Sequence, residues 1–154
     1  MKEIITTNNG IVLVDNEDYE WLNQFKWYKT TFRYTFAAVC YIKPNTTWMH
    51  RLIMKTPKYL VTDHKDHNGL NNQKSNLRVC TQSQNHMNTP CRNGYKGVSW
   101  QKSRQKYIST IYRNGKSYML GRYKIEEEAA EAYNIAAIKM FGEYACLNKV
   151  GKWA

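Results

Sequence analysis

The stretch VTDHKDHNGLNNQKSNLRVCTQSQNHMN, residues 61–88, decides the fold of the first half of the chain. It opens with Asp63 and His64 at the end of a short apolar run. A loop rich in asparagine and glycine follows, and residues 76–80 have the composition of a second short strand. The pattern predicts two short strands joined by a polar loop, with an acid and a histidine where the first strand ends.

A short helix is expected directly after the second strand. Thr81 and Gln84 have the spacing of a capping box, in which each side chain binds the backbone N–H of the other residue at a helix start. The helix must be short, because Pro90 disfavours helical backbone in the residue before it. The predicted order is therefore strand, loop, strand, helix.

This arrangement suits hydrolysis of a phosphodiester at one metal ion. The reaction needs a base that deprotonates water and a cation beside the leaving oxygen. Histidine is the usual base near neutral pH, so His64 is the candidate, while Asp63 and Asn85 offer oxygen ligands for Mg²⁺ or Mn²⁺. Neighbouring strand residues point to opposite faces, so Asp63 and His64 share a site only where the strand ends and bends. The loop signals that begin at Asp66 allow such a bend.

These motifs resemble the HNH nucleases of the phage homing-endonuclease type, with their ββα-metal motif. The resemblance rests on MHRLI at residues 49–53, on Asp63 and His64, and on Asn76 and Asn85, twelve and then nine residues further on. By resemblance, His64 is the general base and Asn76 holds the loop that aims it. Asp63 and Asn85 then bind one divalent metal ion. Asparagine in the third position, in place of histidine, favours Mg²⁺ or Mn²⁺ over Zn²⁺, which prefers nitrogen and sulfur ligands.

Plainer interpretations stay open beside this one. An isolated Asp-His pair is commonly a surface turn, and asparagine-rich loops are usually only loops. His67 and His86 are expected to be neighbours of solvent or phosphate, with His86 a weaker rival of Asn85 as a metal ligand. His50 has either a DNA contact or a structural role.

The composition is that of one folded domain or two small ones in 154 residues, with 42% hydrophobic and 14% aromatic residues. The apolar runs are too short to span a membrane, and residues 1–10 lack the apolar segment of a signal peptide. The cysteines show no C-x-x-C pairing and are expected to be reduced thiols without a zinc site: Cys40, Cys80, Cys91 and Cys146. These features predict a cytoplasmic protein, and the resemblance implies a phage-infected bacterial cell.

The charge points to nucleic acid as the partner. Lys and Arg number 23 against 12 acids, which gives a formal net charge of +11. Residues 1–90 have a net charge of +4 and residues 91–154 one of +7. Nine basic side chains and no acid lie between Arg92 and Lys124. Because no basic amphipathic helix is evident, double-stranded DNA is favoured over a membrane surface.

The residues before the motif are predicted to form a unit that packs behind it. Asn8, Asn9 and Gly10 form a hairpin signal between two apolar runs, and Asp15 has the position of a helix N-cap. The further expected elements are a helix to about Gln24, strands at residues 25–28 and 33–42, and a strand that becomes a helix at 46–54. Three tryptophans are expected to be core residues: Trp21, Trp27 and Trp48. The resemblance to phage HNH nucleases extends to VDNEDYEWLNQFKW at residues 14–27.

The pattern changes after a linker rich in turn residues. Three antiparallel strands are predicted at residues 95–100, 106–113 and 116–123, and a helix at 125–141. Asn114 and Gly115 are a strong type I′ hairpin signal, and Gly142 ends the helix. The alanine-rich face of the helix suits close packing on a sheet. The predicted domains are a nuclease domain at 1–90, a linker at 91–94 and a DNA-binding domain at 95–149.

This second half resembles the plant ethylene-response-factor (APETALA-type) DNA-binding domain. The matching motifs are YKGVSW, the hairpin that ends in Leu120-Gly121-Arg122-Tyr123, EEAAEAYNIAA and Ala145 to Asn148. In that family the sheet lies in the major groove and the helix supports it from behind. Met119 replaces the tryptophan of the plant family, and the turn after the first strand is longer, so base preference does not carry over.

Strand alternation predicts which side chains face DNA. We expect Tyr107, Ser109 and Ile111 to face the helix. The alternate residues of the same strand then face outward: Lys106, Ile108, Thr110 and Tyr112. An ordinary solvated face is the alternative, but such a face usually carries both signs of charge. The expected DNA-binding residues are Lys96, Ser99, Gln101, Lys102, Arg104, Lys106, Thr110, Tyr112, Ser117 and Met119.

The fold class expected from all of this is α+β, with a ββα-metal HNH nuclease domain followed by a three-stranded antiparallel sheet on one helix. The expected function is a monomeric, Mg²⁺- or Mn²⁺-dependent DNA endonuclease of homing type. One site per chain predicts nicking. The alternatives are a DNA-binding regulator with an inactive nuclease fold and an RNA-binding or RNA-cleaving protein.

Overall fold

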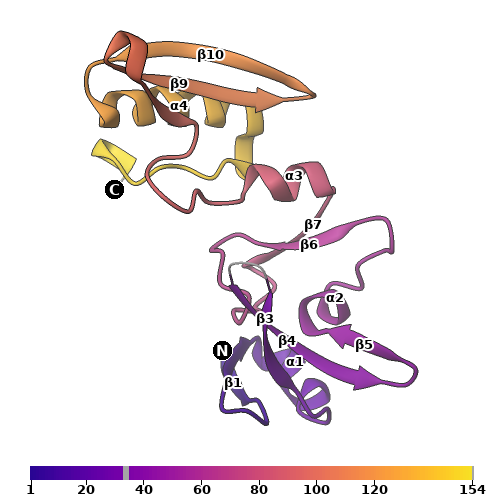
Figure 1. Ribbon diagram of the computed structural model, residues 1–154. Helices are drawn as coiled ribbons and strands as arrows, with labels where there is room; N and C mark the ends of the chain where they lie inside the picture. Colours follow the sequence, from indigo (N-terminus) through magenta and orange to yellow (C-terminus); the bar gives the residue numbers. More distant parts are fainter. Residues whose placement is uncertain (33–34, 154) are drawn as a thin grey trace. The chain divides into compact units, whose positions relative to one another are not determined.

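The computed structural model describes residues 1–32 and 35–153 (Figure 1). The chain divides into two compact units, Met1–Asn85 and His86–Ala154. Both contain small antiparallel sheets and few helices, so the fold is mixed α+β. Within the described residues, no helix is long and apolar enough to cross a membrane.

The first unit begins with the predicted hairpin. Strands β1 (Lys2–Ile5) and β2 (Ile11–Val14) pair antiparallel, and Asn9 adopts the left-handed conformation that the turn requires, with φ of 60°. Helix α1 (Asn16–Leu22) follows. Asp15 has the N-cap position, as expected, but its side chain does not cap α1.

A three-stranded sheet forms the middle of this unit, with the order β3 (Tyr28–Phe32), β4 (Thr35–Ile42) and β5 (Asn45–Trp48), followed by α2 (Met49–Ile53). The strand predicted at residues 25–28 is wrong except for its last residue. The indole of Trp27 is 1% exposed and donates to the Leu22 carbonyl at 2.8 Å, so residues 25–27 bend into the core. Part of the expected strand 33–42 falls on residues 33–34, outside the described residues.

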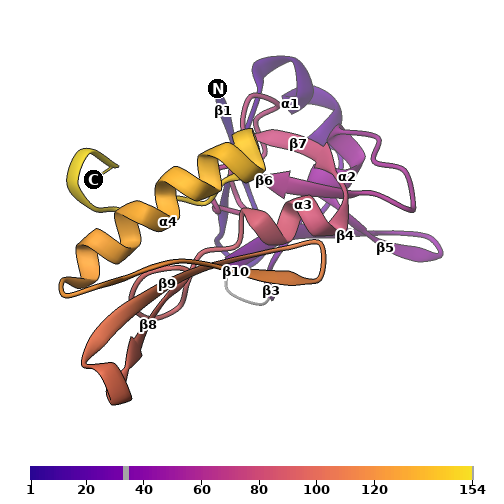
Figure 2. The same ribbon diagram turned by 90° about the horizontal axis from the view of Figure 1, so that it is seen from above.

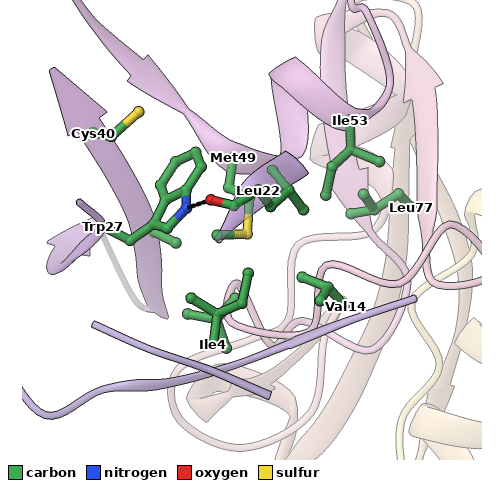
Figure 3. Close-up of a cluster of buried hydrophobic side chains, with 10 residues drawn as sticks. Ile4, Val14, Leu22, Trp27, Cys40, Met49, Ile53 and Leu77 are labelled. Atoms are coloured by element: carbon green, nitrogen blue, oxygen red, sulfur yellow. Dashed lines mark hydrogen bonds between the residues drawn. The ribbon is translucent and has the colours of Figure 1, made fainter. Parts of the chain in front are cut away.

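One hydrophobic core fills the first unit (Figure 3). Side chains from the hairpin, α1, the central sheet and α2 converge there, and Leu77 joins them from the predicted motif. Of the three tryptophans, Trp27 is fully buried, whereas Trp21 packs partly buried against the cluster and Trp48 is partly exposed. The buried members are Ile4, Val12, Val14, Leu22, Trp27, Ala38, Cys40, Met49, Ile53 and Leu77. The motif of residues 61–88 is therefore anchored on this core.

The motif has the expected order of elements. Strands β6 (Val61–His64) and β7 (Leu77–Cys80) pair antiparallel, and α3 (Gln82–Met87) follows. The capping box is confirmed, because the Thr81 N–H donates to Gln84 Oε1 at 2.8 Å and the Gln84 N–H donates to Thr81 Oγ1 at 3.2 Å.

The second unit is a three-stranded antiparallel sheet with α4 (Glu126–Phe141) along it (Figure 2). The strand order is β10 (Lys116–Tyr123), β9 (Lys106–Arg113), β8 (Val98–Gln101), with short 3₁₀ turns at Lys102–Arg104, Gly142–Tyr144 and Gly151–Trp153. Asn114 and Gly115 both have positive φ, 51° and 78°, which confirms the type I′ turn.

The first strand of this sheet starts later than predicted, at Val98, and Gly97 explains why. Its φ is +77°, and a Cβ on Gly97 would collide with the ring of Tyr133 and the backbone of Thr110. The close approach lets Tyr133 on α4 reach the buried cluster beneath the sheet. This cluster contains Ile111, Tyr133, Ala137 and Phe141.

Candidate active site and DNA-binding face

His64 is the last residue of β6, where the chain turns away from the sheet. The His67 N–H donates to the His64 carbonyl at 3.1 Å, and His67 has a φ of 65°. His64 Nε2 lies 3.2 Å from Asn72 Oδ1. Burial lowers the pKa of His64 from its ordinary value, while Asn72 and the nearby carboxylates act in the opposite direction. The lowered pKa favours the uncharged imidazole, the form that can accept a proton.

Asp63 is engaged by an arginine across the strand pair. Its Cα partner is Arg78, whose Nε and Nη2 donate to Asp63 Oδ2 at 2.9 and 2.7 Å. Both side chains are buried, with 6% of Asp63 and 9% of Arg78 exposed. Arg78 was not expected at the site; the cross-strand register, unknown from sequence, brings it there.

Asn76 ties together both ends of the loop between β6 and β7. Its Nδ2 donates to Asp66 Oδ1 at 2.9 Å and to the Asn71 carbonyl at 2.8 Å, and its Oδ1 accepts the Asp66 N–H at 3.1 Å. Burial raises the pKa of Asp66, but hydrogen bonds from Asn68, Asn71 and Asn76 hold it below its ordinary value. These bonds are what the predicted loop-holding role of Asn76 requires.

The remaining residues named from sequence lie at different places around the motif. Asn85 is half-buried on α3, where its N–H donates to the Thr81 carbonyl at 3.0 Å. His67 and His86 are exposed. His50 on α2 packs against His64, with ring centroids 5.1 Å apart at 84°. Burial, and then the charges of His64 and Arg51, lower the pKa of His50 to about 3.

The donor chemistry of the motif fits a sparse magnesium site. Among the described residues no group of three or more His, Cys, Asp or Glu side chains could hold a metal ion. Mg²⁺ needs no such cage, since it keeps several waters and takes one or two carboxylates. A carboxylate has about four lone-pair directions, so Asp63 can serve both Arg78 and a cation. Asn85 would add an amide oxygen.

The outer face of the second sheet has the side chains expected from alternation. Ser109 and Ile111 are buried towards α4, while Tyr112 is 67% exposed. Pairing of Ser117 with Tyr112 and of Met119 with Thr110 places these four on one face. Ser99 and Gln101 pair with Ile108 and Lys106 and extend the same face across β8. Lys102 and Arg104 lie exposed in the 3₁₀ turn after β8.

A register shift adds Arg122 to this face. The pairing with β9 shifts between Met119 and Gly121, so that Arg122 lies opposite Ile108. Arg122 Nε donates to Gln101 Oε1 at 3.0 Å. Strict alternation would place Arg122 on the helix side, which is why sequence reasoning missed it; the Leu120-Gly121 pair was its only local signal.

Lys96, one of the expected DNA-binding residues, makes hydrogen bonds within its own unit. It precedes β8, and its ammonium donates to the carbonyls of Met87 and Thr89, both at 2.6 Å. Its backbone N–H donates to Asn148 Oδ1 at 2.7 Å, and burial lowers the pKa of Lys96. Lys96 therefore holds the segment after α3.

The chain is similar to known proteins in both of its halves. Residues 93–143 match the model of the AP2 domain. An Acanthamoeba polyphaga mimivirus protein named as an uncharacterized HNH endonuclease is 34% identical over 131 residues, which cover 84% of this chain and 70% of that protein. The chain belongs to the family of this viral protein.

A second viral protein is also similar to this chain. Protein 3.8 of Escherichia phage T7 is 33% identical over 93 residues, or 58% of this chain and 76% of that protein. No solved structure matches the chain. An AP2 domain indicates DNA binding, and residues 93–143 carry it in this chain.

Proposed function

We propose that this member of the family is a metal-dependent DNA endonuclease of the HNH type, directed to its substrate by the AP2 domain. The observation that carries the proposal is His64, half-buried at the end of β6, with its Nε2 3.2 Å from Asn72 Oδ1 in the loop of residues 65–76. The relative named as an HNH endonuclease supports the reaction class. The outer face of the second sheet, including Arg122, supports DNA as the substrate.

The residues of the motif divide the reaction between them. His64 accepts a proton from water, the water oxygen forms a bond to phosphorus, and the bond from phosphorus to the leaving oxygen breaks. Asp63 and Asn85 would hold one Mg²⁺ or Mn²⁺, which supplies positive charge beside the leaving oxygen. Asn76 keeps the loop closed through Asp66. One site per chain makes a nick the expected product.

A second candidate function has one observation in its favour. The buried Arg78 neutralises Asp63, the only carboxylate expected to bind the metal. A DNA-binding regulator with an inactive nuclease fold would tolerate such a pair. The two candidates differ in whether DNA is cut.

The experiment that separates them uses supercoiled plasmid and the full chain. The endonuclease should convert plasmid to the nicked circle with Mg²⁺ or Mn²⁺ and not with a chelator, and should leave an RNA of the same sequence uncut. Asp63→Asn, which keeps the shape of the carboxylate, should lose most activity. Plasmid that is bound but never nicked with either metal ion would favour the regulator. Preferential cutting of RNA would mean that RNA is the substrate.

A further inference from the structure

Asn72 is a buried amide in the loop between β6 and β7 that the sequence pattern did not assign to the site. Its side chain is 0% exposed. Oδ1 lies 3.2 Å from His64 Nε2, and Nδ2 donates to the Gly69 carbonyl at 3.4 Å. A buried amide is stable only when its polar atoms have partners, so both contacts constrain Asn72.

These contacts set which nitrogen of His64 carries the proton. Because Asn72 Nδ2 faces the Gly69 carbonyl, the amide oxygen is the atom that faces His64. An amide oxygen only accepts hydrogen bonds, so Nε2 of neutral His64 must carry the hydrogen. The lone pair of the imidazole is then on Nδ1. Water can give its proton only to that nitrogen.

The backbone of Asn72 is held by the hairpin at the start of the chain. The Asn72 N–H donates to the Leu13 carbonyl at 2.8 Å, and the Leu13 N–H donates to the Leu70 carbonyl at 2.9 Å. Two residues further along, Asp15 Oδ2 accepts the Lys74 N–H at 2.8 Å. Strand β2 and the residue after it thus fix the loop on both sides of Asn72.

We propose that Asn72, held by β2, is the positioning residue that fixes the tautomer and orientation of His64, so that Nδ1 is the proton acceptor. The tautomer of His64 is independent of the proposed nuclease function. The role of Nδ1 as acceptor of a proton from water rests on that function. Asn76, which by resemblance holds the loop that aims His64, binds Asp66 and the Asn71 carbonyl. Asn76 closes the loop, and Asn72 orients the base.

The test is the ¹⁵N spectrum of the His64 imidazole in the full chain at a pH where it is neutral. We expect the Nε2–H tautomer in the wild type. Asn72→Leu, which has similar volume and no acceptor, should shift His64 to a mixture of tautomers. It should also lower kcat by about 100-fold, the scale of a misplaced catalytic group, with KM nearly unchanged. Asn72→Asp, which keeps an acceptor oxygen, should retain the tautomer. Ser75→Ala, which changes an exposed side chain of the same loop, is the control.

Three outcomes would overturn the assignment: the Nδ1–H tautomer in the wild type, an unaltered tautomer in Asn72→Leu, or an equal shift in Ser75→Ala. If Asn72→Leu does not fold, the wild type and Asn72→Asp decide, and loss of the Nε2–H tautomer in folded Asn72→Asp counts against it. A wild-type protein that shows the tautomer but does not cut DNA would overturn the nuclease function and leave the role of Asn72 in orienting His64 intact.

Discussion

At the scale of single residues, the candidate site depends on groups that are buried and paired rather than exposed. His64 is oriented by Asn72 and packed by His50, and burial lowers its pKa. Asp63 is paired with Arg78. Breaking a buried ion pair by removing one partner costs roughly 3–5 kcal/mol, so Asp63→Ala would unfold some of the protein as well as remove a ligand. Asp63→Asn also removes the charge but keeps an oxygen that can accept from Arg78, so it is the less disruptive variant.

His50 gives stability a dependence on pH. Its pKa is lowered to about 3 by burial, so between about pH 6.5 and about pH 3 the unfolded chain binds a proton that the folded chain does not. The free energy of unfolding should fall with decreasing pH in this window, by at most roughly 1.4 kcal/mol per pH unit from this group. His50→Gln should flatten the fall, as measured by urea unfolding at a series of pH values.

The control for this measurement is His86→Gln, because His86 is exposed on α3. Its curve should keep the slope of the wild type. If His50→Gln also kept that slope, His50 would be protonated in the folded protein, and the close packing of its ring against His64 would need another explanation.

Asn85 should determine which metal ions support cleavage. Asn85→Ala should lose activity that is partly restored by raising Mn²⁺ or Mg²⁺, because an amide oxygen contributes less than a carboxylate. Asn85→His should extend activity to softer ions such as Ni²⁺ or Zn²⁺. Nicking assays across these metals measure both effects, with His86→Ala as the neighbouring control. An unchanged metal profile in both Asn85 variants would place the ligand elsewhere, with His86 the first residue to test.

At the scale of elements, the predictions that held were local ones. The capping box at Thr81 and the Asn114-Gly115 turn depend only on residues a few positions apart, so sequence alone specifies them. The pairing of Asp63 with Arg78 and the contact of Asn72 with His64 depend on a strand register and a loop path that no local pattern encodes. The same holds for Asp15, whose carboxylate binds the Lys74 N–H instead of capping α1.

The register shift in β10 leads to a prediction about DNA binding. It places Arg122 on the outer face beside Gln101, so Arg122→Ala should weaken binding to duplex DNA about tenfold, the scale of one charge-assisted hydrogen bond. If the contact is to a phosphate, the slope of log affinity against log salt should fall by about 1. Titrations by fluorescence anisotropy would measure both quantities.

Lys139→Ala is the matched control, since Lys139 is an exposed cation in the last turn of α4 and not on the sheet. It should bind DNA as the wild type does. Equal losses in the two variants would mean that the charge of the unit, rather than the outer face of the sheet, binds DNA.

At the scale of the whole molecule, the two compact units suggest a division of labour. Residues 1–90 should retain the site but lose most affinity and site preference, because the AP2 domain lies beyond them. Residues 91–154 alone should bind duplex DNA without cutting it. We expect about four to six phosphate contacts in this half. The slope of log affinity against log salt should therefore be steeper by roughly 4–5 for the full chain than for the 1–90 fragment. A 1–90 fragment that selects its site as the full chain does would contradict this division.

The rate of plasmid nicking by His64→Ala determines whether His64 is the base of a DNA-cleaving site. With Mg²⁺ present and DNA affinity measured in parallel, the variant should cut about 10²–10⁴ times more slowly than the wild type while binding DNA nearly as tightly. His67→Ala, an exposed histidine three residues away, should cut at nearly the wild-type rate. Near-normal nicking by His64→Ala would mean that His64 is not the base.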